Sequence, residues 1–196
     1  MSLHTDNFYN RFSFLYPLVD LVLTAQKKRL FREVNAMPAG KLLEIGTGNG
    51  SHFKWYQTHT ITGIDSSVKM LKTAAGHLNK NITLLQMDAA SLSFPCHSFD
   101  YIILSHVIAV VDDPEKVLEE ACRVLKPGGK IFILNHFTPA NWLGYTDRFF
   151  NFFARRLHFR SVFYADKLTA LKKFTLVKEI NFGWHAYFKL LIYSKP

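Results

Sequence analysis

The chain has 196 residues, of which 48% are hydrophobic and 20% are charged. This length suits one domain with a full core, and this composition excludes a disordered chain. No apolar run reaches the roughly 18 residues that would span a bilayer, so we expect no transmembrane helix. The formal net charge is +9, and the excess cations lie outside residues 41–140, which are balanced.

The uneven charge and the two cysteines constrain partners and compartment. A basic flank favours an anionic partner, such as a lipid surface, although solubility alone would also explain it. Cys96 and Cys122 lack the spacing of a metal or redox pair and suit a reducing compartment. We therefore expect a cytoplasmic protein with no metal site, either free or peripheral on the inner face of the membrane.

Apolar runs alternate with helical patterns from residue 41 onward, which predicts an α/β fold with helices on both faces of a parallel sheet. The expected strands are Lys41–Ile45, Thr60–Asp65, Ile82–Gln86, Tyr101–Leu104, Lys130–Asn135, Thr175–Ile180 and Tyr187–Ser194. A helix is expected from Pro114, a favoured first-turn residue, to the stop signals of 126–129. Asn181-Phe182-Gly183 is expected to open the last connection.

Two segments lie outside the expected sheet. Residues 5–37 have a helical pattern and form an N-terminal cap, and residues 138–170 form a helical insert before the sixth strand. The insert places phenylalanines on one helical face, and Arg155, Arg156 and Arg160 follow them. Such a helix either docks on a lipid interface or packs in the core, and the pattern leaves both open. We expect one domain over 1–196, with a cofactor-binding core at 41–135 and a strand pair at 175–194.

A glycine-rich turn follows the first strand, in the segment Glu44-Ile45-Gly46-Thr47-Gly48-Asn49-Gly50. Glycines tolerate positive φ and lack a Cβ, so the backbone there can approach a ligand closely. Asp65 ends the second strand, where one carboxylate can hold two ribose hydroxyls. These features predict a nucleoside half-site. The dinucleotide fingerprint has its third glycine at the position of Ser51, so the spacing departs from a pyrophosphate site.

The spacing Glu44-x-Gly46-x-Gly48-x-Gly50 resembles motif I of the class I S-adenosylmethionine-dependent methyltransferases. Asp88-Ala89 resembles the adenine-binding motif of this family, 93–100 resembles its entry into strand 4, and 123–129 resembles its Arg-x-Leu-Lys-Pro-Gly-Gly motif. The resemblance implies a Rossmann-like sheet of seven mostly parallel strands with an antiparallel last strand. It also implies S-adenosylmethionine as cofactor and S-adenosylhomocysteine as product.

The resemblance also implies which residues hold the cofactor. The glycine loop contacts its amino acid and ribose parts, Asp65 binds the ribose, and Asp88-Ala89 binds the adenine. Ser66 is expected to cap the next helix and Met70 to pack on the adenine, although ordinary capping and core packing explain both as well. The full expected set is Glu44, Gly46, Thr47, Gly48, Asn49, Gly50, Asp65, Ser66, Met70, Asp88, Ala89 and Ser105.

The sequence constrains the identity of the methyl acceptor less than that of the cofactor. Tyr9-x-Arg11 and Tyr16 resemble an N-terminal segment shared by ubiquinone/menaquinone C-methyltransferases and soluble bacterial phosphatidylethanolamine N-methyltransferases, although Asn10 and Pro17 replace its usual aspartates. The segments 105–115 and 135–137 resemble the second group, which implies a phospholipid amine as acceptor. The alternatives are a quinone precursor, another small molecule or an inactive cofactor binder. A nucleic-acid methyltransferase that uses the basic C-terminal part is a less favoured alternative, because the tetrapeptide that base-amine methylases often carry after strand 4 is absent. No nucleic acid partner is therefore expected.

Methyl transfer from a sulfonium is an in-line displacement that depends mainly on positioning. An amine acceptor must first lose a proton, for which His106, His136 or a tyrosine is the expected acceptor. The rings of Tyr9 and Tyr16 are placed to hold the sulfonium or a methylated ammonium by cation–π contact. The oligomeric state is left open by the sequence.

Overall fold

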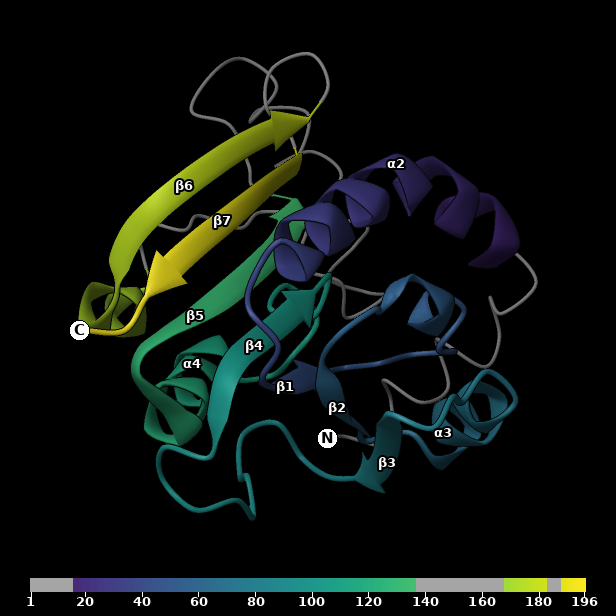
Figure 1. Cartoon of the computed structure of the whole chain (residues 1–196), viewed down its shortest axis with the longest axis horizontal. Helices are drawn as coiled ribbons and strands as arrows, with labels where there is room; N and C mark the ends of the chain where they lie inside the picture. Colours follow the sequence, from purple (N-terminus) through teal and green to yellow (C-terminus); the bar gives the residue numbers. More distant parts are fainter. Residues whose placement is uncertain (1–15, 137–167, 183–187) are drawn as a thin grey trace.

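The computed structural model describes residues 16–136, 168–182 and 188–196, with side chains from residue 24 onward in the first range. Its seven strands form one sheet in the order β3-β2-β1-β4-β5-β7-β6 (Figure 1). The strands are β1 (Lys41–Ile45), β2 (Thr60–Asp65), β3 (Ile82–Gln86), β4 (Phe99–Ser105), β5 (Leu125–His136), β6 (Thr175–Phe182) and β7 (Phe188–Ser194). Strand β7 pairs antiparallel with both β5 and β6, whereas the other pairs are parallel. The predicted Rossmann-like sheet with an antiparallel last strand is confirmed.

The chain order reverses beside the central strand β1. From β1 the chain proceeds outward through β2 and β3, and it then returns to pair β4 with the other side of β1. In open α/β sheets a ligand binds in the crevice at such a switch point, outside the carboxyl ends of the strands. The topology therefore places the glycine turn after β1 and the residues after β4 at one common edge.

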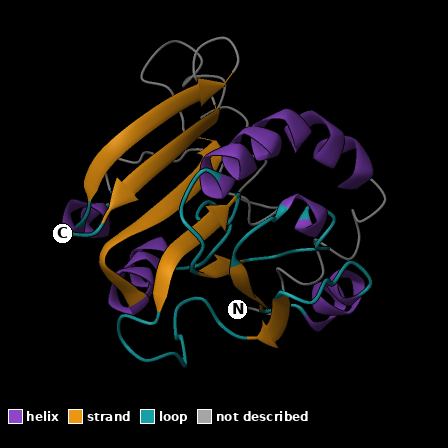
Figure 2. Ribbon diagram, viewed as in Figure 1, coloured by secondary structure: helices purple, strands orange, loops and turns teal. Residues whose placement is uncertain are grey.

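Helices cover both faces of the sheet, as the alternation of patterns predicted (Figure 2). The helical elements are α2 (Tyr16–Asn35), η2 (Phe53–Trp55), α3 (Val68–Ala75), α4 (Pro114–Val124) and η5 (Thr169–Lys173). Neighbouring residues of one strand enter opposite cores, because side chains alternate across a sheet. Ile103 packs in the core that includes Leu30 of α2, and Ile102 packs in the core that includes Leu118 of α4.

The family motifs around β4 hold its first residues in place. Asp100 accepts hydrogen bonds from Lys126 Nζ at 2.7 Å and from the backbone N–H of Lys41 at 2.8 Å. Partial burial acts to raise the pKa of Asp100, but the Lys126 and Lys41 hydrogen bonds outweigh it and lower that pKa. Arg123 donates to Glu120 at 2.7 Å and to the carbonyl of Phe94 at 2.7 Å. These motifs therefore tie the segment before β4 to α4 and β5.

The boundary between α4 and β5 differs from the prediction. The helix starts at Pro114, as expected, but β5 starts at Leu125 and includes the proline and glycines of 127–129, where a loop was expected. Leu125 pairs with Phe99, which also starts β4 earlier than predicted. Gly128 adopts φ +75°, and its N–H donates to the carbonyl of Lys195 at 2.9 Å. Leu125 and Lys130 pair with β4 on either side of residues 126–129, so this turn-like segment is an irregularity within β5.

The remaining differences lie at the chain flanks. Asn181 and Phe182 belong to β6 and pair with β7, so the expected connection starts later than predicted. Residues 5–15 of the expected N-terminal cap and 138–167 of the expected insert lie outside the described residues. Within the described ranges, no helix is long and apolar enough to cross a bilayer.

Candidate active site

The three glycines after β1 each adopt a left-handed backbone, with φ of +74° at Gly46, +57° at Gly48 and +70° at Gly50. A Cβ on Gly46 would lie 2.4 Å from Val107 Cγ2, and one on Gly50 would lie 2.7 Å from the Phe53 ring. A Cβ on Gly48 would meet nothing within 4 Å. The outer two glycines therefore allow close packing of the protein, whereas Gly48 borders open space.

Asp65 lies at the carboxyl end of β2, beside this loop. Its Oδ2 accepts the N–H of Gly48 at 2.9 Å, and its Oδ1 accepts the N–H of Ser67 at 2.9 Å. These two bonds fix the orientation of the carboxylate and hold the glycine loop beside the end of β2. A carboxylate oxygen can accept more than one hydrogen bond, so these two bonds do not by themselves exclude a sugar hydroxyl.

Glu44 has a different environment, although it was expected to bind the cofactor with Asp65. The residue is 1% exposed, its Oε2 accepts the hydroxyl of Tyr56 at 2.8 Å, and its Oε1 lies 2.7 Å from His52 Nε2. Burial, followed by the nearby carboxylate, raises the pKa of Tyr56 well above its ordinary value. Glu44 therefore anchors the segment after the glycine loop. Sequence reasoning missed Tyr56 and His52, whose spacing of four along the chain was the available signal.

The other side chains of the loop shape its backbone. Thr47 is 2% exposed, and a Cβ on Gly63 would lie 2.5 Å from its Cγ2. Asn49 Oδ1 accepts the N–H of Ser51 at 3.1 Å, which closes a local turn. Thr47 and Asn49 are thus placed to meet a ligand mainly through their backbone.

The ends of β2 and β3 lie together on the side expected to hold the adenosine. The N–H of Met87 donates to the carbonyl of Asp65 at 3.2 Å, which places Asp88 and Ala89 beyond the neighbouring strand end. Asp88 is exposed, and its Oδ1 accepts the N–H of Ala90 at 2.9 Å. The arrangement is compatible with the expected ribose and adenine contacts.

The helix cap after β2 corrects one expectation. Ser67, and not Ser66, caps α3, because its Oγ accepts the N–H of Met70 at 3.3 Å. The bond from the Ser67 N–H to Asp65 places Ser67 at the cap position, while the Ser66 carbonyl accepts Gln86 Nε2 at 3.2 Å. Met70 lies half-buried in the first turn of α3.

The expected histidines meet at the carboxyl ends of β4 and β5. His106 follows Ser105 with φ +59°, and its N–H donates to the carbonyl of Leu134 at 2.7 Å. The ring of Phe188 has its centroid 5.9 Å from that of His106 and 6.3 Å from that of His136. His136 is 7% exposed, whereas His106 is half-buried. The structure thus brings both histidines to one aromatic ring that sequence reasoning did not identify.

The two expected tyrosines are not placed by the structure. Tyr9 lies outside the described residues. Tyr16 is the first residue of α2, but its side chain is also outside the described part. Their expected contact with the sulfonium or the acceptor therefore stays a prediction.

Comparisons with known proteins agree with this geometry. A family model described as a methyltransferase domain matches residues 43–133. The chain is 30% identical over 181 residues to a phosphatidylethanolamine N-methyltransferase of Cereibacter sphaeroides, covering 89% of each chain. It is 34% identical over 115 residues to a ubiquinone/menaquinone biosynthesis C-methyltransferase of Bdellovibrio bacteriovorus, covering 55% of this chain and 49% of that protein.

A solved structure shows the same fold. It is an S-adenosylmethionine-dependent methyltransferase from Thermotoga maritima, with a TM-score of 0.72 and 23% sequence identity. The match covers 97% of this chain and 99% of that protein. The two proteins therefore share one fold.

Proposed function

Because the chain belongs to the S-adenosylmethionine-dependent methyltransferases, we propose that it transfers the methyl group to the amine of a phospholipid such as phosphatidylethanolamine. The observation that carries this proposal is the extent of similarity to the Cereibacter sphaeroides N-methyltransferase. That similarity covers 89% of both chains, and so includes regions flanking the cofactor-binding core. In this fold the core binds the cofactor, and the flanks are the parts free to differ with the acceptor.

The residues of the β1–β3 half fit the cofactor. Open space beside Gly48 accommodates a ligand that a side chain there would exclude. Asp65 would accept hydroxyl groups of the ribose, and Asp88 with the N–H of Ala89 would bind the adenine edge. When bound, S-adenosylmethionine supplies a methyl carbon that its sulfonium makes electrophilic.

The β4–β5 half provides what an amine acceptor requires. A protonated amine has no lone pair for the displacement, so it must lose its proton before it attacks. A ring nitrogen of neutral His106 would take this proton, directly or through water. Its left-handed backbone and the hydrogen bond to Leu134 hold the residue at the sheet edge. His136 and Phe188 would form the wall behind it.

Peripheral contact with an anionic membrane is part of this proposal. The excess positive charge lies outside the balanced core, mostly in residues 141–196. Cations near an anionic leaflet contribute about 1 kcal/mol each to binding. Activity on lipid should therefore be higher in anionic vesicles than in zwitterionic ones at equal substrate content.

A second candidate is methylation of a quinone precursor. The specific observation in its favour is the 34% identity to the Bdellovibrio bacteriovorus C-methyltransferase, which is higher than the identity to the lipid enzyme but covers a shorter region. Carbon methylation of a phenolic ring would require deprotonation of a hydroxyl, for which the same histidines would serve.

The deciding experiment is transfer of a radiolabelled methyl group from S-adenosylmethionine to acceptors presented in vesicles. We expect label in an amine-bearing phospholipid and none in a demethylated quinone. Purified Asp65→Ala protein serves as the control that should lack cofactor-dependent transfer. Intact cofactor binding with no label in any lipid would contradict the lipid proposal, and label in the quinone would establish the second candidate.

A further inference from the structure

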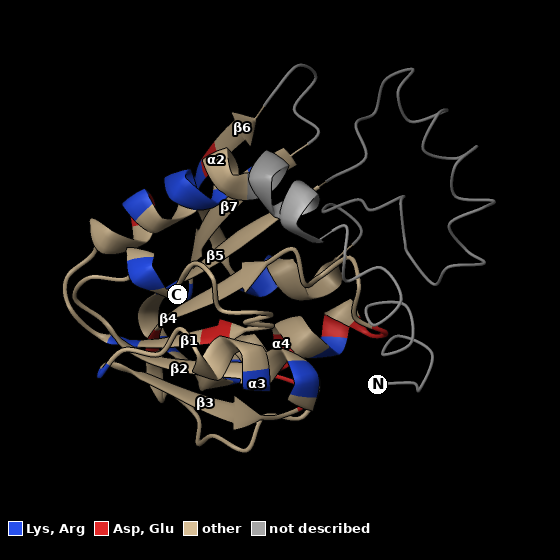
Figure 3. Cartoon of the chain, turned by 90° about the vertical axis from the view of Figure 1, so that its right-hand side faces the viewer, with Lys and Arg blue, Asp and Glu red and all other residues tan. Residues whose placement is uncertain are grey.

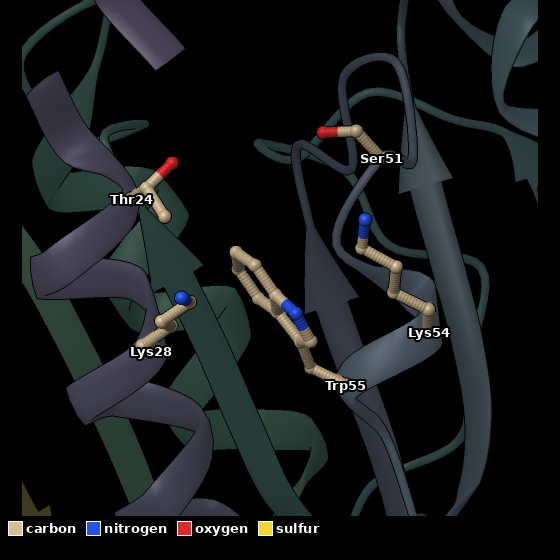
Figure 4. Close-up of a pocket in the computed structure, with 5 residues that line it drawn as sticks. All are labelled: Thr24, Lys28, Ser51, Lys54 and Trp55. Atoms are coloured by element: carbon tan, nitrogen blue, oxygen red, sulfur yellow. The ribbon is translucent and has the colours of Figure 1, made fainter. Parts of the chain in front are cut away.

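A pocket of about 280 Å³ lies between α2 and the segment after the glycine loop (Figure 4). Its lining residues are Thr24, Lys28, Ser51, Lys54 and Trp55. Two of them come from α2, two from η2, and Ser51 directly follows Gly50 of the loop. The pocket therefore adjoins the loop at which the cofactor is proposed to bind.

The walls of this pocket are fixed to one another. The Asn35 side chain donates to the carbonyl of Trp55 at 2.8 Å, which ties η2 to the last residue of α2. The Trp55 indole packs against the Phe31 ring, with centroids 5.5 Å apart in an edge arrangement. Figure 4 shows this indole between Lys28 on one side and Lys54 on the other. Two lysines from different elements thus line the same pocket.

The side chains that line the pocket carry a net positive charge. None of its lining residues is acidic, and within the described ranges neither Lys28 nor Lys54 forms an ion pair. The neighbouring Arg29 does, with Glu33 at 2.8 Å. Basic residues extend along α2 (Figure 3). Two ammonium groups that line one pocket repel one another, so an anion within reach of both is favoured.

We propose that this pocket binds the phosphate group of the methyl acceptor, with Lys28 and Lys54 as the charged donors. The identity of the phosphate as part of the acceptor rests on the function proposed above. Ammonium groups form charge-assisted hydrogen bonds to phosphate oxygens, and lysine is a common phosphate ligand. The Trp55 indole would cover the carbon chain next to the phosphate. Because Ser51 joins the pocket to the glycine loop, a phosphate held here leaves the rest of the headgroup beside the cofactor.

Binding can be measured without catalysis. Trp55 lines the pocket and is one of three tryptophans, so quenching of tryptophan fluorescence should report glycerophosphoethanolamine, and Trp55→Phe should remove that signal. The test variant is Lys28→Ala/Lys54→Ala. The control is Lys72→Ala/Lys80→Ala, which removes the same charge from exposed positions away from the pocket. We expect the test variant to bind the headgroup about tenfold more weakly than the control, with unchanged S-adenosylmethionine affinity.

Separate ligands distinguish the source of the phosphate. Inorganic phosphate tests a free anion, glycerophosphoethanolamine tests a lipid headgroup, and ethanolamine tests the amine alone. Tighter binding of the headgroup than of inorganic phosphate, with both lost in the test variant, supports the assignment. Equal headgroup affinity of the test and control variants would overturn it.

Activity separates this assignment from the proposed function. If phospholipid is the acceptor, the test variant should raise its KM about tenfold with little change in kcat. If no label enters phospholipid but the lysine pair still governs phosphoester binding, the pocket stands and the lipid function fails. If label enters phospholipid with the same KM in both variants, the lipid function stands and the pocket assignment fails.

Discussion

The two halves of the sheet are built in different ways. In the β1–β3 half, the key contacts join residues that are close in sequence, such as Gly48 and Asp65, which are 17 positions apart. In the β4–β5 half, His106 and His136 meet Phe188 of β7, which comes from the end of the chain. A local motif thus defines the half that we propose to bind the cofactor. Distant segments assemble the half that would select the acceptor.

Glu44 and Asp65, the two acids near the glycine loop, show the same contrast on a smaller scale. Glu44 is buried against Tyr56 and His52, whereas Asp65 is half-buried at the end of β2 and contacts the loop backbone. Glu44 therefore supports the protein, and Asp65 is the carboxylate that we propose for the ligand. Substitutions in the two halves test these contrasts, and the greatest effect is expected at Asp65.

Asp65→Ala should weaken S-adenosylmethionine binding about a thousandfold, measured by calorimetry. The substitution removes the proposed ribose acceptor and both hydrogen bonds to the N–H groups of Gly48 and Ser67. Hydrogen bonds to charged groups contribute about 1.5–3 kcal/mol each. Asp65→Asn, which keeps one acceptor oxygen, should lose less. Unchanged affinity in the alanine variant would refute the ribose role.

His106→Ala should lower kcat about a hundredfold while leaving cofactor affinity unchanged, because general base catalysis contributes about this factor or more. His136→Ala should have the smaller effect, since His136 is 7% exposed and less accessible to an acceptor. The comparison is made by steady-state kinetics over pH, where loss of the base should remove the acidic limb of the profile. Equal, wild-type kcat in both variants would assign proton removal to another group.

Gly46→Ala should destabilise the protein by about 2 kcal/mol more than Gly48→Ala. Both positions have positive φ, which costs a side chain about 1–2 kcal/mol, but only at Gly46 would the new Cβ overlap Val107. Chemical denaturation measures this difference. Gly48→Ala should instead reduce cofactor affinity, because its Cβ would project into the open space beside the loop. Equal stability losses would show that the Val107 contact relaxes freely.

Tyr56→Phe should cost about 1 kcal/mol at neutral pH by removing the hydrogen bond to Glu44. The pKa of Tyr56 is raised in the folded state, so the folded protein retains the proton that the unfolded chain loses above pH 10.0. The stability of the wild type should therefore fall as the pH rises above that value. Urea denaturation at about pH 8 and about pH 11 should show a smaller fall in the variant. An identical fall would assign the alkaline loss to other groups.

Strand positions were the most predictable part of the fold. The predicted bounds of β1, β2 and β3 are confirmed, because each is a short apolar run ended by turn residues or an acid. The start of β5 was wrong because Leu125 pairs with Phe99 ahead of the irregular segment 126–129. The start of the β6–β7 connection was wrong because Asn181 and Phe182 pair with β7. The cap at Ser66 was wrong by one residue, since two adjacent serines differ only in which of them Asp65 holds.

The α/β architecture was predictable from the periodicity of the sequence, and the family and cofactor followed from the resemblance of its short motifs to those of known methyltransferases. Only the tertiary structure decided that Glu44 is enclosed, that Phe188 joins His106 and His136, and that Lys28 and Lys54 share a pocket. These contacts depend on how α2, η2 and the last strand pack against the sheet. The physical reason is that packing brings together residues whose separation along the chain carries no local signal.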